Sequence, residues 1–290
     1  MTMIVEARGL SKSYGKVPAL RPCSLSIPAG RIVGVIGPNG AGKSTLINAM
    51  LGLINYDGDL KVLGHEPLTD RAALMREVSF IADVATLPRW IRVRDLLDIV
   101  AGIHPRFDRA AAEARLARTS VRPAARVREL SKGMIVQVHL AIVLAIDARL
   151  LVLDEPTLGL DLINRRAFYD AILSDFFDES RSIVVTTHQV EEIEHVLTHV
   201  VMINRGEIVL DASIDALVER FTAVDVVDAR AAEAQALNPV YARKSFGRTT
   251  YVFDSLPAGQ VALLGEPRRV PLADLFVAIA GPQAASGEVA

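Results

Sequence analysis

One stretch of nine residues, 37–45, constrains what this chain can fold into more than any other. It matches the phosphate-binding loop pattern of Gly, four residues, Gly, Lys and Ser or Thr. An apolar run at 31–36 precedes it and a mostly apolar run at 46–51 follows it, so the loop should connect a buried strand to a helix. A glycine-rich turn without a ligand would leave its lysine unexplained, and we therefore predict a site for nucleotide phosphates. The loop consists of Gly37, Pro38, Asn39, Gly40, Ala41, Gly42, Lys43, Ser44 and Thr45.

Each residue type in this loop suits a bound polyphosphate. Successive backbone N–H groups can wrap an anion only where no Cβ blocks the approach, which accounts for the glycines. The helix expected after Gly42 adds its N-terminal N–H groups and its dipole. Lys43 is expected to neutralise the β and γ phosphates, Ser44 to coordinate Mg²⁺, and Thr45 to reach the α phosphate.

Apolar runs elsewhere in the chain predict an α/β fold. The runs 150–153 and 182–187 are short and mostly apolar, as in parallel strands that are buried on both faces. A helical pattern at 164–177 lies between them and gives a strand-helix-strand unit. Further elements are predicted as strands at 4–10, 23–27, 60–64 and 78–82, turns at 11–15 and 57–59, and a hairpin at 200–203 and 207–210. Helices are predicted at 71–76 and 135–146, with Ser131 as an N-cap ahead of the second.

The pattern changes at two places along the chain. Between residues 88 and 128 strand signals are missing and apolar residues recur at helical spacing, which predicts a small helical insertion. One such apolar stripe consists of Leu96, Leu97, Val100 and Ile103. Beyond residue 221 the pattern predicts a small α+β appendage that ends in a disordered tail from 282. Its predicted elements are strands at 224–227, 242–246 and 249–253 and helices at 231–237 and 272–280.

The strand at 150–153 ends in two adjacent carboxylates, Asp154 and Glu155. Burying two carboxylates is costly unless a cation or a proton transfer requires them. Beside a phosphate loop, Asp154 is expected to hold Mg²⁺ through water, and Glu155 to orient and deprotonate the water that attacks the γ phosphate. His188, at the end of the strand 182–187, either contacts the same phosphate or is a polar residue of the strand end.

Composition excludes several classes of protein. A net charge of −2 over 290 residues gives no basic footprint, so nucleic acid is disfavoured as a partner. The most apolar stretch, 140–146, has seven residues, against the roughly 20 that a membrane-spanning helix needs. The first six residues lack the pattern of a secretory signal, and the single Cys23 cannot form an internal disulfide. We therefore expect a cytoplasmic protein.

Over residues 3–220 the sequence contains several motifs that resemble those of ABC transporter ATP-binding subunits and occur in the same order along the chain. The phosphate loop resembles the Walker A motif, Leu-Ser-Lys-Gly-Met at 130–134 the signature, and 150–161 the Walker B motif running into the D-loop. The resemblance implies an ABC ATPase core at 1–220, with a β subdomain and a helical subdomain at about 84–148, followed by an accessory α+β domain at 221–290. Residue type alone leaves Tyr14 either a rim aromatic or a purine platform, whereas the family implies that Tyr14 stacks on adenine and that His188 is the switch histidine.

The same resemblance implies an ATPase that uses ATP and Mg²⁺ and works as a head-to-tail homodimer. Ser131, Lys132 and Gly133 of the signature would close the partner's phosphate loop, and Asp161 would link the two sites. The motion of the dimer would power an exporter, of the ABC-2 type, through separate transmembrane permease subunits at the inner face of the membrane. The permease selects the cargo, so this sequence does not name it.

Two departures from the family pattern leave alternatives open. Asp83 stands where the family usually has Gln; it could ligate Mg²⁺ but cannot donate an amide hydrogen bond. In the signature, Lys132 and Met134 replace Gly and Gln. These departures leave open a nucleotide-gated regulatory module with little turnover. A soluble ABC ATPase that acts on ribosomes or DNA is the other alternative, but such proteins carry two ATPase halves or long coiled coils, and this sequence shows neither. The segment around Trp90 either receives the permease or belongs to the core.

Overall fold

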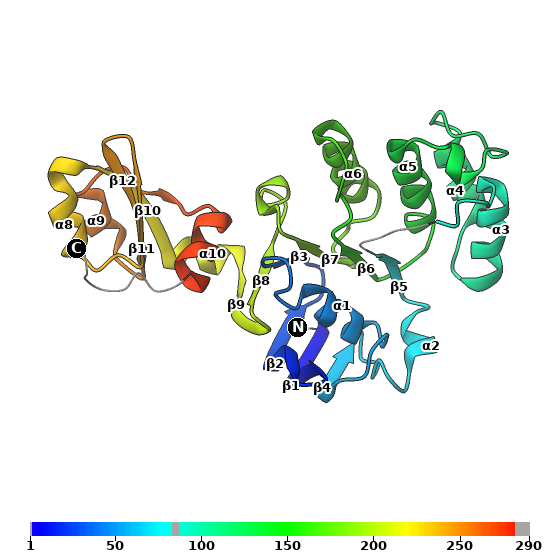
Figure 1. The fold of residues 1–290 in the computed structure, drawn as a ribbon, viewed down its shortest axis with the longest axis horizontal. Coiled ribbons are helices and arrows are strands. Elements are labelled where there is room, and N and C mark those ends of the chain that lie inside the picture. Colours follow the sequence, from blue (N-terminus) through cyan, green and yellow to red (C-terminus); the bar gives the residue numbers. More distant parts are fainter. Residues whose placement is uncertain (1, 83–86, 282–290) are drawn as a thin grey trace.

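The computed structural model describes residues 2–82 and 87–281. Within them the chain forms three sheets, and Figure 1 shows the N-terminal sheet below the largest one, with the C-terminal sheet at the opposite end of the molecule from α3 and α4. The strands are β1 (Met3–Tyr14), β2 (Val17–Pro28), β3 (Ile32–Ile36), β4 (Asp57–Val62), β5 (Val78–Ile81), β6 (Leu150–Asp154), β7 (Ser182–Thr187), β8 (His199–Asn204), β9 (Glu207–Ser213), β10 (Phe221–Val227), β11 (Tyr241–Ser245), β12 (Arg248–Asp254) and β13 (Arg268–Arg269).

Helices connect and cover these strands. They are α1 (Lys43–Met50), α2 (Arg71–Leu74), α3 (Val93–Ile103), α4 (Arg109–Leu116), α5 (Lys132–Val143), α6 (Leu162–Asp175), α7 (Ile214–Arg220), α8 (Ala231–Gln235), α9 (Ala258–Ala262) and α10 (Leu272–Ala280), with 3₁₀ turns η1 (Val127–Glu129), η2 (Val190–Glu192) and η3 (Asp228–Arg230). The predicted α/β class is confirmed.

The central sheet has the strand order β5-β6-β7-β3-β8-β9, and only β9 runs antiparallel to its neighbour. Every residue of β3, β6 and β7 is buried, as predicted for strands covered on both faces. Successive side chains of these strands point to opposite faces, so Leu151 and Leu153 pack with the helices while Leu150 and Val152 pack with the N-terminal sheet. Because β3, β6 and β7 run parallel, their carboxyl ends meet at one edge of the sheet, where the phosphate loop, Asp154, Glu155 and His188 follow.

The N-terminal sheet, in the order β2-β1-β4, corrects two predicted boundaries. We predicted a strand that ends at residue 10 and a turn at 11–15, but β1 continues to Tyr14, which pairs with Val17. Register shifts on both sides of Leu10 break the alternation of buried and exposed residues along the strand. Because of this irregularity, the sequence pattern of the second half of β1 resembles that of a turn. Similarly, β4 begins at Asp57, which pairs with Ser11, and the predicted turn at 57–59 is wrong.

The insertion between β5 and β6 is helical, as predicted, and consists of α3, α4, η1 and α5. Leu96 and Leu97 are buried, whereas Ile103, which we predicted on the same apolar stripe, is exposed. Helix α5 begins at the predicted N-cap, because the Ser131 hydroxyl accepts a hydrogen bond of 3.2 Å from the Met134 N–H.

The C-terminal sheet, in the order β11-β12-β10-β13, has the strands and helices that we predicted beyond residue 221. Val224, Tyr251 and Phe253 belong to a small core of its own. Helix α10 returns to the central sheet, where Leu272 and Leu275 join the main core and the Asn204 side chain donates to the Ala280 carbonyl at 2.9 Å. The predicted disordered tail, 282–290, lies outside the described residues.

Candidate active site

The phosphate loop lies between β3 and α1, as predicted from the sequence. Gly42 is the N-cap of α1 and has a φ of 114°, which disfavours any residue with a Cβ. At Gly37 the constraint is different, because a Cβ there would lie 2.2 Å from the Ile203 carbonyl oxygen. The backbone of the loop therefore lies close to β8.

A cavity of about 320 Å³ opens above this loop. Six of the seven residues 39–45 line it, and so does Glu155, which directly follows β6. The lining residues are Ala19, Asn39, Gly40, Gly42, Lys43, Ser44, Thr45 and Glu155. The cavity thus joins the predicted phosphate site to the predicted catalytic carboxylate.

Lys43 is held inside the loop. Its side chain is only 6% exposed, and its ammonium group donates to the Gly37 carbonyl at 2.8 Å and to the Pro38 carbonyl at 3.3 Å. The same ammonium lies 3.2 Å from Oε1 of Glu155, a contact that is electrostatic, because this oxygen has no hydrogen bond of good geometry among the described residues. The lysine is therefore placed between the loop and the carboxylate, where an anion can draw it away from the carbonyls.

The two carboxylates at the end of β6 are held by β7. Asp154 is buried and accepts a hydrogen bond of 2.5 Å from the Thr186 hydroxyl. The same hydroxyl oxygen accepts from the Glu155 N–H at 2.9 Å. Glu155 has a φ of 45°, in the left-handed region that residues with a Cβ seldom adopt, and such strain concentrates at functional sites.

His188 follows β7 directly and lies against Glu155. Its Nδ1 atom is 2.8 Å from Oε2 of Glu155, so the carboxylate contacts Lys43 with one oxygen and His188 with the other. The contact supports the reading of His188 as a functional residue over that of a polar strand end. A carboxylate held between two nitrogen donors, at the mouth of a phosphate loop, is placed to receive a proton from water that lies over the loop.

The other predicted residues lie apart from this cavity within the chain. Tyr14, at the end of β1, is 52% exposed and does not line the cavity. Ser131, Lys132 and Gly133 begin α5 and lie beside the D-loop and α6, with Gly133 close to the Asn164 side chain. Asp161 is the N-cap of α6, and its hydrogen bonds with Asn164 lower the pKa of its carboxyl group. Asp83 lies outside the described residues.

The residues present can help to hold Mg²⁺, but they do not enclose it. Ser44 lines the cavity and Asp154 offers carboxylate oxygen, and both are the hard oxygen donors that Mg²⁺ prefers. Across 2–82 and 87–281, three His, Cys, Asp or Glu side chains nowhere come close enough together to hold a metal by themselves. The geometry fits an ion that takes most of its other ligands from phosphate and water.

The sequence analysis did not predict that Thr186 and Ala19 belong to the site. Thr186 binds the Asp154 carboxylate and the backbone N–H of Glu155, and Ala19 lines the cavity from β2. The signal for Thr186 was present, since two threonines follow the aliphatic residues 183–185 at the end of a strand that is fully buried. No sequence signal marked Ala19, whose position depends on the packing of β2 against the loop.

Comparisons with known proteins identify the family of this chain. A family model described as ABC transporter matches residues 20–158. The chain is 31% identical over 296 residues to the Nod factor export ATP-binding protein I of Sinorhizobium fredii, covering 96% of this chain and 86% of that protein. It is 30% identical over 300 residues to the protein of the same name from Rhizobium meliloti, covering 97% of this chain and 89% of that protein.

Solved structures show the same fold. A structure described as the ATP-binding subunit of an ABC transporter superposes with a TM-score of 0.64 at 24% identity, over 74% of this chain and 91% of that one. A nucleotide-free ATP-binding cassette from an ABC transporter gives a TM-score of 0.62. None of the helices in the described part of the chain has the length and apolar character to cross a membrane. The chain therefore belongs to the ATP-binding subunits of ABC transporters, ATPases that drive transport through transmembrane partner proteins.

Proposed function

We propose that this chain is the ATPase subunit of an ABC-2-type exporter, with Glu155 as the base that activates the attacking water. The observation that carries the assignment is the pair of contacts made by the Glu155 carboxylate, 3.2 Å to Lys43 Nζ and 2.8 Å to His188 Nδ1, at the edge of the phosphate cavity. Glu155 has a strained backbone and a largely buried carboxylate beside the phosphate loop. Such a residue at such a site is suited to the hydrolysis of a bound phosphoanhydride.

The residues around the cavity then take separate roles. Lys43 leaves the Gly37 carbonyl and contacts the β and γ phosphates, while the loop N–H groups bind their oxygens. Glu155 accepts a proton from water, and His188 orients that carboxylate and donates toward the γ phosphate. Ser44 and Asp154 would hold Mg²⁺, which neutralises charge on the phosphates.

Two copies of the chain are proposed to enclose ATP head to tail. Ser131 and Lys132 are exposed at the start of α5 and do not line the cavity of their own chain, so they are free to meet the cavity of a second copy. Exposed apolar side chains at Leu158, Leu162 and Ile163 flank Asp161 and give this face the character of an interface. Tyr14, 52% exposed, is free to stack on the adenine ring.

The helical segment is proposed to receive the transmembrane partner at the inner face of the membrane. Trp90 is 69% exposed, and Ile99 and Ile103 on α3 are exposed as well, whereas Ile91 is buried and belongs to the core. Exposed aromatic and aliphatic side chains on one segment mark contact sites for another protein. Residues 1–220 would act as the nucleotide-binding domain and 221–290 as an accessory domain.

The direction of transport is proposed from the relatives, whose names describe export of Nod factor. The substrate of this exporter would be chosen by its transmembrane partner, as the resemblance to ABC transporter ATP-binding subunits implies.

The assignment of the base is tested by measuring phosphate release from ATP. Glu155→Gln keeps the size of the side chain but removes its basicity, and it should lower kcat by roughly 10²-fold or more while ATP still binds. Glu219→Gln, which makes the same change at an exposed position of α7, should leave kcat unchanged. Equal turnover in the two variants would refute the role of Glu155. Near-zero turnover of the unmodified protein together with its membrane partner would instead favour a nucleotide-gated regulatory module.

A further inference from the structure

Two loops of this chain converge on Glu155 from different elements. The D-loop runs from Glu155 to Asp161, and the Leu158 N–H donates to the Glu155 carbonyl at 3.2 Å. The second loop begins with His188 after β7 and continues through Gln189 into η2. The position of His188 against Glu155 therefore depends on how these two loops are fixed to each other.

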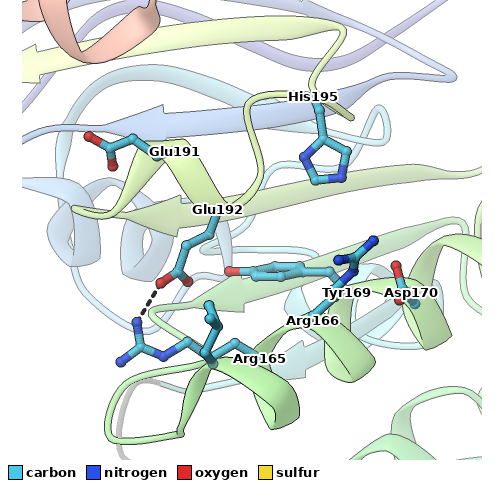
Figure 2. A pocket seen from close by; sticks show the side chains of 8 residues that line it. Arg165, Arg166, Tyr169, Asp170, Glu191, Glu192 and His195 are labelled. Atoms are coloured by element: carbon cyan, nitrogen blue, oxygen red, sulfur yellow. Dashed lines mark hydrogen bonds and ion pairs between the residues drawn. The ribbon is translucent and has the colours of Figure 1, made fainter.

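Arg165, in the first turns of α6, connects the two loops. Its Nε donates to the Leu160 carbonyl of the D-loop at 2.7 Å. Its Nη1 donates to Oε1 of Gln189, the residue next to His188, and to Oε1 of Glu192 in η2. Figure 2 shows Arg165 and Glu192 facing each other across the space between α6 and η2, with their contact marked.

The chemistry of these contacts requires arginine. The planar guanidinium presents several N–H groups in a fixed fork, so one side chain can bind acceptors on two loops at once, which a lysine ammonium on a flexible stem cannot reproduce. The side chains of Arg165 and Glu192 are only 22% and 18% exposed, so solvent screens their attraction incompletely. The Glu192 carboxylate relies on this contact, since its other oxygen, Oε2, is buried without a hydrogen-bond partner among the described residues.

We infer that Arg165 is a positioning residue for ATP hydrolysis: it fixes the segment that carries His188 to the D-loop and so sets the angle at which His188 meets Glu155. The inference rests on the proposed roles of Glu155 and His188. Arg165 does not line the phosphate cavity, so it acts on turnover through His188 and leaves the binding of ATP to other residues. Because the Arg165 guanidinium binds both loops, a displacement of the D-loop would also displace the segment that carries His188.

The neighbouring Arg166 provides a matched control. It lies on the same helix, lines the same cavity of about 390 Å³ between α6 and η2, and carries the same charge. Its side chain, unlike that of Arg165, makes no hydrogen bond or ion pair with the described residues. Arg165→Ala should lower kcat for ATP by about tenfold, a fraction of what a positioned acid or base contributes, with KM and the dissociation constant for ATP changed less than about twofold. Arg166→Ala should leave all three unchanged.

Further variants separate positioning from general damage to the fold. Arg165→Lys should recover little of the lost kcat, because the ammonium cannot bind both loops. Gln189→Met, which removes one acceptor and keeps the size of the side chain, should lower kcat in the same direction even if Arg165→Ala folds poorly. In a His188→Ala background, measured by single-turnover hydrolysis, Arg165→Ala should cause little further loss, since the group that it positions is gone.

The inference is overturned if Arg165→Ala hydrolyses ATP as fast as Arg166→Ala, if its loss and that of His188 multiply as independent effects, or if Arg165→Lys restores full turnover. Glu155→Gln, measured in parallel, tells which statement has failed. If that variant stays active, the proposed function is wrong; if it is inactive while Arg165→Ala is fully active, only the role of Arg165 is wrong.

Discussion

At the residue scale, one buried hydroxyl connects the two acidic residues of the site, through the Asp154 carboxylate and the Glu155 backbone. Thr186 donates to Asp154 at 2.5 Å and accepts from the Glu155 N–H at 2.9 Å, and it is fully buried. These two hydrogen bonds of its hydroxyl group position the Asp154 carboxylate and the backbone of Glu155 at the end of β6. Sequence reasoning identified the carboxylates because two adjacent acids end an apolar strand, whereas the pairing of β6 with β7 was needed to identify their support.

Thr186→Val keeps the shape of the side chain and removes the hydroxyl, so it should leave a buried carboxylate oxygen and a backbone N–H with poorer partners. We expect the free energy of unfolding to fall by about 1–3 kcal/mol, the usual cost of an unsatisfied buried polar group. Thr186→Ser, which keeps the hydroxyl, should lose clearly less. Urea unfolding of both variants measures the difference, and equal stability of the two would show that the hydroxyl does not support the carboxylates.

At the element scale, helix α5 combines a predicted start with an unpredicted property. Its N-cap, Ser131, was correctly identified from the sequence. His139, further along the helix, lies partly buried, and burial lowers the pKa of its imidazole from 6.5 to about 4, because the charged form loses hydration. The folded protein therefore keeps this histidine neutral at pH values where the unfolded chain would protonate it.

This difference predicts a loss of stability in acid. Above pH 6.5 the histidine is neutral in both states and costs nothing; as the pH falls from 6.5 toward 4, only the unfolded chain binds the proton, so the free energy of unfolding decreases. The loss attributable to His139 should reach at most about 2 kcal/mol by pH 5. His139→Gln removes the titration, so urea unfolding at pH 7.5 and pH 5 should show a smaller decrease for the variant. The same decrease in both proteins would contradict the assignment.

Local signals account for the elements that were predicted well, and non-local contacts for those that were not. The phosphate loop, the N-cap at Ser131 and the buried strands β3, β6 and β7 are each specified by residues within one segment. The length of β1 was missed because its pairing with β2 and β4 overrides irregular local alternation. The contacts of Arg165 join residues 24 and 27 positions apart, and no short pattern indicates them.

At the scale of the whole molecule, the C-terminal unit is tied to the nucleotide-binding part through α10. The Leu272 N–H donates to the Glu194 carboxylate at 3.2 Å, and Asn204, at the end of β8, donates to the Ala280 carbonyl. Asn204 follows Ile203, whose carbonyl lies against Gly37 of the phosphate loop. Composition predicted that the unit exists, but its attachment beside the loop follows only from the three-dimensional path of the chain.

The proposed pairing of two chains also belongs to this scale. Within one chain the phosphate cavity lacks the signature residues, which begin α5 on another part of the surface. A second copy can supply them, and ATP bound between the copies then holds the pair together until it is hydrolysed. A variant that binds ATP without hydrolysing it should therefore accumulate as a dimer.

The most direct test is the molar mass of Glu155→Gln, measured by light scattering after gel filtration, with and without ATP and Mg²⁺. We expect a monomer of 31.4 kDa without nucleotide and a species of about twice that mass with ATP and Mg²⁺. Lys43→Ala in the Glu155→Gln background, which weakens phosphate binding, should stay monomeric under both conditions. If Glu155→Gln binds ATP and yet remains a monomer, even with its transmembrane partner present, two copies do not enclose the nucleotide.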